Sequence, residues 1–265
     1  VCPWCAVGLH ALERAAEAVR DEVQLDWHFQ PFELNPGMPP EGQDMQEHLQ
    51  EKYGSTPEQL AHTRTVLAER GAQVGFTFNL DKRTRTWNTF DAHRLLHWLG
   101  EEGAPGQQRA LKHALLAAYF TEGRNPSDHA VLLDVVAALG LDVARARAVL
   151  EGGEYAGEVR EREQFYQGLG IHSVPSIIIN DRHLISGGQP VEVFEQALRQ
   201  IASQVQPGRP GRFKRRRTIS CTCDLAARPW PTTAFFICSA VYSATGRLAC
   251  TSAVSAAPRA WPSSS

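Results

Sequence analysis

The cysteines of this chain are confined to its two ends, and this distribution limits what can hold the fold together. Cys2 and Cys5 stand at the start, four more fall between residues 221 and 250, and residues 6–220 contain none. A disulfide framework is therefore excluded for most of the chain. The fold must rest on an apolar core, for which 265 residues are sufficient. One close pair in a body otherwise without cysteine indicates reactive rather than structural sulfur.

Charge is distributed unevenly along the chain. The formal net charge of −2 indicates neither a nucleic-acid nor a membrane partner, but residues 205–265 hold nine Lys and Arg residues and a single acidic residue. This tail is rich in Pro, Ser, Thr and Ala and lacks a helical or strand period. We expect it to be disordered or aberrant, for example through a shift of the reading frame. The basic run at 213–217 is interpreted as a solvated charge run rather than a nucleic-acid patch.

No segment carries a membrane or secretion signal. No stretch is long and apolar enough to span a bilayer, and Val1 is not followed by a basic and then an apolar signal region. We therefore expect no membrane partner and a cytoplasmic location. The chain does not open with Met, and we expect further residues upstream of Val1.

Hydrophobic periodicity predicts helices and strands in a characteristic order. A helix is predicted over 6–19, and the apolar–polar alternation over 23–29 is typical of a half-buried strand. Prolines between residues 31 and 40 then end regular structure. The next segment is predicted to be almost entirely helical, with helices near 57–71, 88–103, 107–120, 125–139, 142–150 and 154–169.

Strand signals return near residue 175. The β-branched run 176–179 is typical of a strand buried on both faces, a turn and a short strand at 183–185 follow, and Pro190 opens a last helix. Val193 is expected on the buried face of that helix. The predicted organisation is a first part of an α/β domain, a helical insertion, the second part of that domain and a tail, with boundaries at 1–40, 41–168, 169–204 and 205–265.

Cys2-Pro3-Trp4-Cys5 places two sulfur atoms one helical turn apart at a predicted helix start. With Cys2 at the N-cap and Pro3 in the first helical position, unpaired backbone N–H groups and the helix dipole favour negative charge on Cys2. The pKa of Cys2 is thereby lowered, which supplies the thiolate that attacks disulfides. Cys5 is better shielded and can resolve the mixed disulfide. Pro3 and Trp4 are expected to tune the reduction potential and to contact a partner polypeptide.

The same motif is also compatible with half of a zinc site. Structural zinc needs two further ligands, but Cys221 and Cys223 have the wrong spacing, and His10 lies about two turns from Cys2. We therefore favour redox chemistry and expect no metal and no cofactor. The ten histidines are scattered. Of these, His93 and His97 share one helix face and are interpreted as packed or surface side chains.

Val174-Pro175 directly precedes the apolar strand at 176–179. A proline in this position can be a built-in cis residue or an ordinary trans residue at a strand start. Local sequence favours the trans form, because only about 5–6 % of X–Pro bonds in folded proteins are cis.

Several motifs in the same order resemble the DsbA/FrnE-like branch of the thioredoxin superfamily. Besides the cysteine motif and Val174-Pro175 they occupy Pro31–Pro36, Asn88–Leu95, Ala118–Gly123 and Ile185–Pro190, and the resemblance covers about residues 1–203. It implies an α/β thioredoxin-like fold with a large all-helical insertion. It also implies that Cys2 is the nucleophile, Cys5 the resolving cysteine, Pro175 a cis-proline facing them, and Val174 the residue that pairs with a substrate backbone.

The activity implied by the resemblance is thiol–disulfide exchange on polypeptide thiols and disulfides, as an oxidase, a reductase or a disulfide isomerase. The same branch includes 2-hydroxychromene-2-carboxylate isomerases and kappa-class glutathione transferases, which usually have serine where Cys2 stands and lack the second cysteine. A glutathione-dependent isomerase or transferase, with glutathione as partner, is therefore the alternative. A non-catalytic, chaperone-like binder is a third hypothesis. The sequence indicates no oligomeric state.

Two departures from the family pattern concern the start of the chain. The family has a strand inside the sheet immediately before the cysteine motif, whereas only Val1 precedes Cys2 here. Loss of that strand removes ladder partners and apolar cover at a cost comparable to the whole stability margin of a domain. We therefore expect the chain as written to be poorly stable or to fail to fold. The second departure is Ala6-Val7, where the family often has an aromatic residue and isoleucine.

Overall fold

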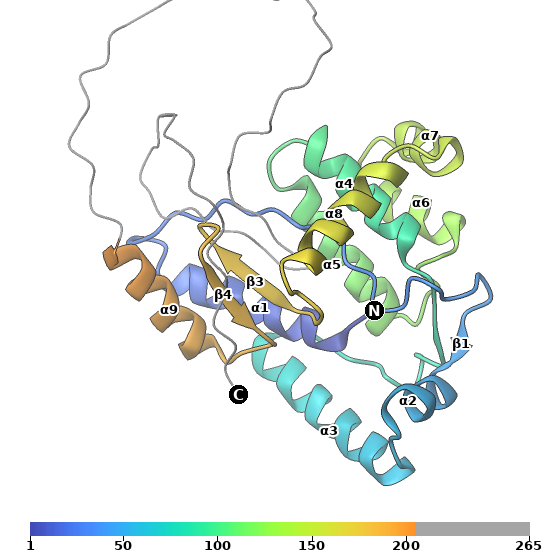
Figure 1. Ribbon diagram of the computed structural model, residues 1–265, viewed down its shortest axis with the longest axis horizontal. Helices are drawn as coiled ribbons and strands as arrows, with labels where there is room; N and C mark the ends of the chain where they lie inside the picture. The colour runs from blue at the N-terminus through green and yellow to red at the C-terminus, as the bar shows by residue number, and fades with distance from the viewer. Residues whose placement is uncertain (205–265) are drawn as a thin grey trace, which may run out of the picture.

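One helix, α1 (Pro3–Ala18), runs through the centre of the molecule, and the other elements pack around it (Figure 1). The structure is a computed structural model that describes residues 1–204. The predictions made for the tail, including its cysteines and its basic run, lie outside the described residues. Along α1, buried side chains occur on almost every side, and Ala6, Val7 and Leu9 are fully buried. Its N-terminal half therefore lies within a core, whereas Arg14 and Glu17 in the C-terminal half are exposed.

The second part of the α/β domain is a hairpin followed by a helix. Strands β3 (Ser176–Ile179) and β4 (His183–Ser186) are antiparallel, with Ser176 opposite Ser186 and Ile179 opposite His183. The predicted turn at Asn180 and Asp181 is confirmed, and both residues have positive φ angles, of 52° and 54°. Polar Asn and Asp tolerate this left-handed conformation in tight turns.

Helix α9 (Val191–Gln204) covers α1 with one apolar face. Phe194, Leu198 and Ile201 are buried on that face. The prediction that Val193 lies there is wrong, since this side chain is 42 % exposed. Residue 193 falls off the stripe that positions 194, 198 and 201 form at helical spacing.

The strand predicted over residues 23–29 is absent. The segment runs alongside α1 without ladder hydrogen bonds, although Val23 and Phe29 are buried and Gln24 and Asp26 are exposed. The alternation predicted which side chains face the core, but a strand also needs a neighbour to pair with. Among the described residues, β3 pairs only with β4, and no strand lies beside residues 23–29.

The insertion contains seven helices, one more than predicted, and a pair of two-residue strands. They are β1 (Gln43–Asp44), α2 (Met45–Tyr53), α3 (Pro57–Val74), β2 (Arg85–Thr86), α4 (Phe90–Glu101), α5 (Gln107–Phe120), α6 (His129–Ala138), α7 (Val143–Gly152) and α8 (Ala156–Gly168). Helix α2 was missed because Met45 is its one buried residue, so it shows almost no apolar period. Its signals are the caps, with Asp44 accepting from two backbone N–H groups and Gly54 in a left-handed conformation.

Helix α3 has the predicted start but a later end. Thr56 and Gln59 form a capping box, with Pro57 in the first turn. The prediction that Gly71 ends the helix is wrong, because the helix continues to Val74 and ends at Gly75 with φ of 81°. Gly71 instead permits close packing, since a Cβ there would lie 2.6 Å from the carbonyl oxygen of Phe76.

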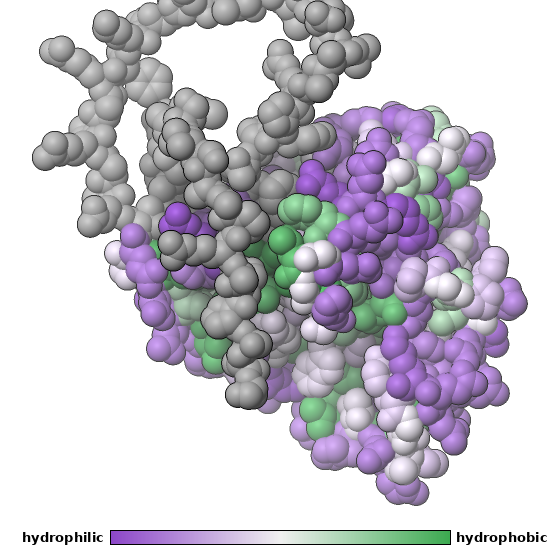
Figure 2. Space-filling view, in the orientation of Figure 1, coloured by the Kyte–Doolittle hydropathy of each residue, from purple (hydrophilic) through white to green (hydrophobic). Residues whose placement is uncertain are grey.

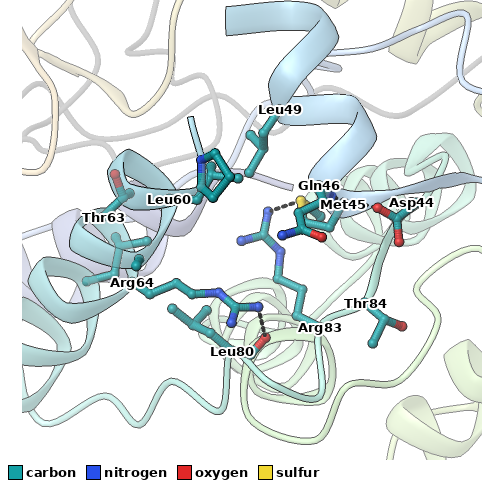
Figure 3. Close-up of a pocket in the computed structure, with 13 residues that line it drawn as sticks. Asp44, Met45, Gln46, Leu49, Leu60, Thr63, Arg64, Leu80, Arg83 and Thr84 are labelled. Atoms are coloured by element: carbon teal, nitrogen blue, oxygen red, sulfur yellow. Dashed lines mark hydrogen bonds between the residues drawn. The ribbon is translucent and has the colours of Figure 1, made fainter. Parts of the chain in front are cut away.

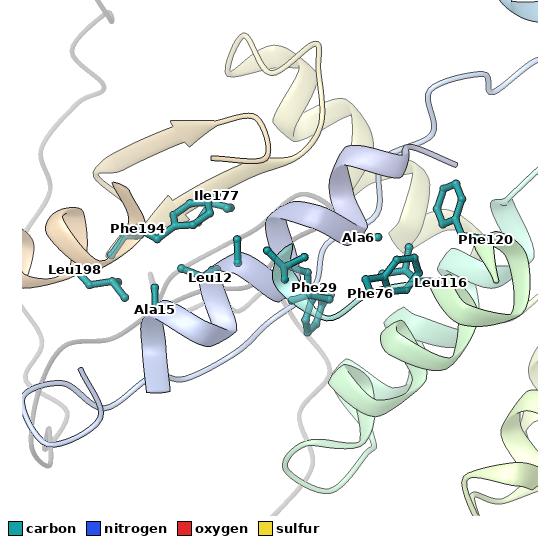
Figure 4. Close-up of a cluster of buried hydrophobic side chains, with 14 of the residues drawn as sticks. Ala6, Leu12, Ala15, Phe29, Phe76, Leu116, Phe120, Ile177, Phe194 and Leu198 are labelled. Carbon is teal, nitrogen blue, oxygen red and sulfur yellow. The ribbon is translucent and has the colours of Figure 1, made fainter. Parts of the chain in front are cut away.

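Two large apolar cores and a small cluster of Phe32, Tyr166 and Ile171 hold the described residues together. The first surrounds α1 and draws side chains from β3 and α9 on one side and from residue 29, α3 and α5 on the other (Figure 4). The second core is formed within the insertion by α4, α5, α6 and α7. Helix α3 and the C-terminal half of α5 therefore complete the core around α1, although both belong to the insertion. In residues 1–204, no helix combines the length and the apolar character needed to cross a membrane.

Candidate active site around Cys2 and Cys5

Cys2 is the N-cap residue of α1. Its backbone is extended, with φ of −90° and ψ of 122°, and Pro3 occupies the start of the helix. No acidic residue lies in the first turn, so the positive end of the helix dipole is left to act on the Cys2 sulfur. The N–H of Cys5 donates to the Cys2 carbonyl oxygen at 3.2 Å, which closes the first turn. This local structure follows from the sequence, because proline is favoured where a helix begins.

The surroundings of Cys2 lower its pKa from about 9 to about 7. The largest cause is a hydrogen bond from the Cys5 side chain, which stabilises the thiolate, and the backbone N–H of Cys5 acts in the same direction. Burial opposes both. Cys2 remains partly exposed, whereas Cys5 is only 2 % exposed, and both are free thiols. The lowered pKa favours the thiolate of Cys2 at neutral pH more than in an ordinary cysteine, with a shielded second thiol beside it.

The loop before β3 faces this pair of thiols. The peptide bond between Val174 and Pro175 is cis, the form that the family resemblance implied. The Cys2 thiol donates to the Val174 carbonyl oxygen at 3.3 Å, and the Pro175 carbonyl oxygen accepts from the N–H of Gly187 at 2.8 Å. These bonds tie the start of α1, the proline loop and the end of β4 into one assembly.

Two glycines allow this assembly to pack closely. A Cβ on Gly8 would lie 3.1 Å from Cγ of Pro175, and a Cβ on Gly188 would lie 3.0 Å from the carbonyl oxygen of Trp4. The insertion also reaches this point, since Arg70 on α3 donates to the Gly188 carbonyl oxygen at 3.1 Å. The positions of α1 and of the proline loop are thus coupled through backbone contacts that larger residues would disturb.

A small cavity of about 60 Å³ lies between the cysteines and the insertion. Its lining consists of Val1, Cys2, Cys5, Phe32, Leu34, Thr89, Ala92, His93, Leu96, Lys112, Leu115, Leu116, Pro126 and Val174. Figure 2 shows hydrophobic residues near the centre of this face, around the position that Figure 1 marks as the N-terminus, with hydrophilic residues toward the rim. The walls are mostly apolar, and the polar atoms that face them are few.

The cavity brings together some of the residues singled out from the sequence but not others. Cys2, Cys5 and Val174 line it, whereas Pro3 and Trp4 do not. The Trp4 side chain packs against the first core instead. Pro175 lies against Gly8. Sequence reasoning interpreted His93 as a packing or surface residue, and it is buried, but its place in this cavity was not foreseen.

Lys112 is the cavity residue that sequence reasoning missed altogether. It lies on α5, is only 6 % exposed, and faces the same space as Cys2 and Cys5. Nothing in the sequence distinguishes it from a surface lysine, because it is one charged residue on a predicted helix. Its burial depends on tertiary packing, because it lines a cavity together with residues of α1 and α4. Within residues 1–204, no group of three or more His, Cys, Asp or Glu side chains could hold a metal ion.

Comparison with known proteins decides the family. The DsbA-like thioredoxin domain family matches residues 1–199. The chain belongs to this family. A crystal structure described as a probable DsbA oxidoreductase from Streptomyces coelicolor is 33 % identical, with a TM-score of 0.69, and the match covers 86 % of this chain and 95 % of that one. Both findings support the α/β thioredoxin-like fold with its helical insertion and the resemblance recognised from the sequence.

Two further proteins are similar at lower identity. YwbO of Bacillus subtilis, whose activity is uncharacterized, is 28 % identical over 200 residues, which make up 75 % of this chain and 91 % of YwbO. A 2-hydroxychromene-2-carboxylate isomerase structure has a TM-score of 0.58 at 15 % identity, covering 77 % of this chain and 92 % of the isomerase. The second match shows a shared fold only.

Proposed function

We propose that this DsbA-like protein catalyses thiol–disulfide exchange on polypeptide substrates, with Cys2 as nucleophile and Cys5 as resolving cysteine. The observation that carries the proposal is the position of Cys2 at the start of α1, where its pKa falls to about 7 under the influence of the Cys5 thiol. A thiol with a pKa near the ambient pH is both sufficiently ionised and sufficiently nucleophilic for fast exchange.

In the reductive direction the reaction has two steps. The Cys2 thiolate attacks one sulfur of a substrate disulfide, which forms a Cys2–substrate disulfide and releases the other substrate sulfur as a thiolate. Cys5 then loses its proton and attacks the Cys2 sulfur, which forms the Cys2–Cys5 disulfide and releases the second substrate thiolate. The substrate gains two electrons and the cysteine pair loses two. The oxidative direction is the same sequence reversed.

The Val174 carbonyl supports a polypeptide as substrate. In the reduced protein this oxygen accepts a hydrogen bond from the Cys2 thiol. A thiolate or a mixed disulfide has no proton to donate, so reaction at Cys2 leaves the Val174 oxygen free to accept an N–H from an extended substrate backbone. Attack at Cys2 and backbone pairing at Val174 would thus occur together.

The glutathione-dependent alternative rests on the shared fold with 2-hydroxychromene-2-carboxylate isomerase. The presence of two thiols, one of which lowers the pKa of the other, favours redox chemistry over isomerisation. The two functions require different residues and substrates. Disulfide exchange requires Cys2 and a disulfide or dithiol substrate, whereas the alternative requires bound glutathione and a small aromatic substrate.

The decisive experiment is insulin reduction by the full chain, in a parent variant whose cysteines at 221, 223, 238 and 250 are replaced by serine. This parent removes any contribution from the tail thiols. Cys2→Ser should abolish turnover, and Cys5→Ser should accumulate a disulfide-linked adduct with the substrate. Retained turnover in Cys2→Ser would contradict the proposal. Glutathione-dependent activity on small aromatics without insulin turnover would support the alternative, and suppression of aggregation without turnover would support a binder.

The direction of electron flow follows from the reduction potential of the pair. Equilibration of the parent variant with glutathione buffers, followed by alkylation and mass measurement, gives this potential. A value near about −270 mV would match thioredoxin-type reductases, and one near about −120 mV would match strong oxidases.

A further inference from the structure

A second and larger cavity, of about 350 Å³, lies between α2, α3 and the loop that precedes β2 (Figure 3). It shares no lining residue with the cavity beside Cys2. Its volume falls in the range of about 300–1,000 Å³ that is typical of small-molecule sites. None of the candidate site residues named from the sequence lines it.

Its walls are mainly apolar. Met45 and Leu49 come from α2, and Leu60 and Leu67 from α3, with Leu80 at the base of the loop. The three charged residues in the lining are Asp44, Arg64 and Arg83. The Asp44 carboxylate is occupied as the N-cap of α2, where it accepts from the N–H groups of Gln46 and Glu47.

Arg83 is the polar centre of this cavity. Its Nε donates to the Tyr119 hydroxyl at 3.0 Å, and its Nη2 lies 3.1 Å from the Met45 sulfur. Its guanidinium also lies over the rings of Tyr119 and Phe120, at 5.5 and 5.3 Å from their centroids. Among residues 1–204, no carboxylate forms an ion pair with Arg83, and its remaining N–H groups have no acceptor.

Arg64 adds a second positive charge. It donates to the Leu80 carbonyl oxygen at 3.3 Å and to the exposed carboxylate of Asp81 at 3.2 Å. Figure 3 shows the guanidinium groups of Arg64 and Arg83 reaching toward the same space from α3 and from the loop. Of the two, only the half-buried Arg83 guanidinium lacks a carboxylate partner among residues 1–204, which is costly in an apolar setting unless an anion satisfies it.

We propose that this cavity binds a small amphipathic carboxylate, with the carboxylate on Arg83 and Arg64 and the apolar body against the leucines of α2 and α3. Arginine presents a fork of donors that matches the two oxygens of a carboxylate. The aromatic rings and the Tyr119 hydroxyl hold the Arg83 guanidinium in place, so little side-chain freedom is lost when the ligand binds. This site is independent of the thiol chemistry proposed for Cys2.

The test is calorimetric titration of the full chain with octanoate and with 3-phenylpropionate, which separate an aliphatic from an aromatic source of the same chemistry. One-to-one binding of either is the expected result. Across butanoate, hexanoate and octanoate the affinity should rise about fourfold per methylene, because each buried methylene contributes a constant increment. Octanol, which has no charge, should bind at least tenfold more weakly than octanoate.

Variants locate the site. Arg83→Gln should weaken octanoate binding at least tenfold, and Arg64→Gln, at a more exposed position, should weaken it severalfold. Ala61→Trp, which fills the cavity from an exposed position on α3, should abolish binding. Arg199→Gln is the matched control, since this arginine on α9 is far from the cavity lining and should leave binding unchanged.

Four results would overturn the proposal: no binding of either carboxylate at millimolar concentration, octanol binding as tightly as octanoate, inorganic phosphate binding as tightly as octanoate, or octanoate binding that Arg64→Gln and Ala61→Trp both leave intact. Insulin turnover of Arg64→Gln and Ala61→Trp should equal that of the parent. A failure of the thiol chemistry would therefore leave this test unaffected.

Discussion

The Cys2 sulfur and the Val174 carbonyl oxygen lie 3.3 Å apart, although 172 positions separate the two residues in the chain. The contact joins the N-cap residue of α1 to the loop before β3, and the whole insertion lies between these two residues in the sequence. It places the reactive sulfur beside a backbone acceptor whose hydrogen bond depends on the protonation state of that sulfur. Ionisation of Cys2 removes the proton of this hydrogen bond, and under the proposed function it would free the oxygen that we propose to pair with a substrate backbone.

The lowered pKa of Cys2 predicts a specific pH profile. In the parent without tail cysteines, the alkylation rate of Cys2 by iodoacetamide should rise with a midpoint near pH 7, about two units below that of an ordinary thiol.

The same shift predicts how stability depends on pH. A group with a depressed pKa stabilises the fold above its unfolded pKa and loses this effect as pH falls through its folded pKa. The unfolding free energy of the reduced protein should therefore rise between pH 7 and 9, by on the order of 2 kcal/mol.

Cys2→Ser is the control for both parts of that profile. Its unfolding free energy should lack the rise between pH 7 and 9, and iodoacetamide should modify the N-terminal peptide only slowly, at the buried Cys5. A midpoint near 9 in the parent would show that the helix start does not stabilise the thiolate.

The Cys5 side chain is the largest cause of the low pKa, and this can be separated from the helix dipole. Cys5→Ala removes the hydrogen bond to the Cys2 sulfur and should raise the pKa of Cys2 above 7. Cys5→Ser keeps a donor at the same place, so its alkylation midpoint should stay closer to that of the parent. Equal midpoints in Cys5→Ala and the parent would assign the shift to the helix start alone.

The packing of Gly8 against Pro175 predicts a stability effect with a clear sign. Alanine is favoured over glycine in a helix by about 1 kcal/mol, but a Cβ on Gly8 would lie 3.1 Å from Pro175 and 3.3 Å from the Gly188 backbone. We expect Gly8→Ala to lower the unfolding free energy by about 1–2 kcal/mol in urea titrations, since overpacking outweighs propensity. Gly157→Ala on α8, with no atom within 4 Å of its added Cβ, should be neutral or stabilising. Equal effects of the two substitutions would refute close packing at Gly8.

Much of the fold was predictable because local rules coincide with tertiary packing. The start of α1, the capping box of α3, helix α5 and the hairpin at 176–186 each carry a local signal, such as a proline, a cap or a turn. The segment over 23–29 shows what such local signals cannot predict. Alternation gave its buried and exposed sides, but pairing depends on a neighbouring strand, which no local pattern reveals. Lys112 was missed for the same reason, since its burial depends on tertiary packing.

Gln108 replaces part of the missing strand pairing at Phe29. Its side-chain Oε1 accepts from the Phe29 N–H at 2.9 Å, and its Nε2 donates to the Phe29 carbonyl oxygen at 2.9 Å and to that of Leu96 at 3.0 Å. Gln108→Met would leave the Phe29 N–H and carbonyl oxygen without these partners, at about 1–3 kcal/mol for each. We expect the unfolding free energy to fall by about 2–4 kcal/mol in urea titrations. Gln196→Met, at an exposed position on α9, should change it by less than about 0.5 kcal/mol. A loss at Gln108 no larger than this would contradict the bridging role.

The buried Glu33 carboxyl predicts a second pH range over which the unfolding free energy changes. Burial raises the pKa of Glu33 to about 7, and the nearby carboxylate of Glu163 adds to the effect, although Arg160 opposes it. The Glu33 carboxyl is buried with its Oε1 lacking a hydrogen-bond partner among the described residues, and Glu163 accepts from the Glu33 N–H at 2.9 Å. Because two buried carboxylates share Arg160, the folded protein binds a proton at Glu33 more tightly than the unfolded chain does.

The unfolding free energy should change with pH in the direction opposite to that predicted for Cys2. An acid whose folded pKa is raised stabilises the fold below its unfolded pKa of about 4.5, and the effect is lost as pH rises through about 7. The unfolding free energy should therefore fall between pH 4.5 and 7, by on the order of 3 kcal/mol. Glu33→Gln should flatten this slope, whereas Glu41→Gln, at an exposed position in the same segment, should keep it. A parent whose stability is constant over this window would show that Glu33 is ionised in the folded protein.

Phe32, the neighbour of Glu33, lines the cavity beside Cys2, so the same variants should be compared in the insulin assay. A loss of insulin turnover confined to pH above 7 would link Glu33 to the cysteine site.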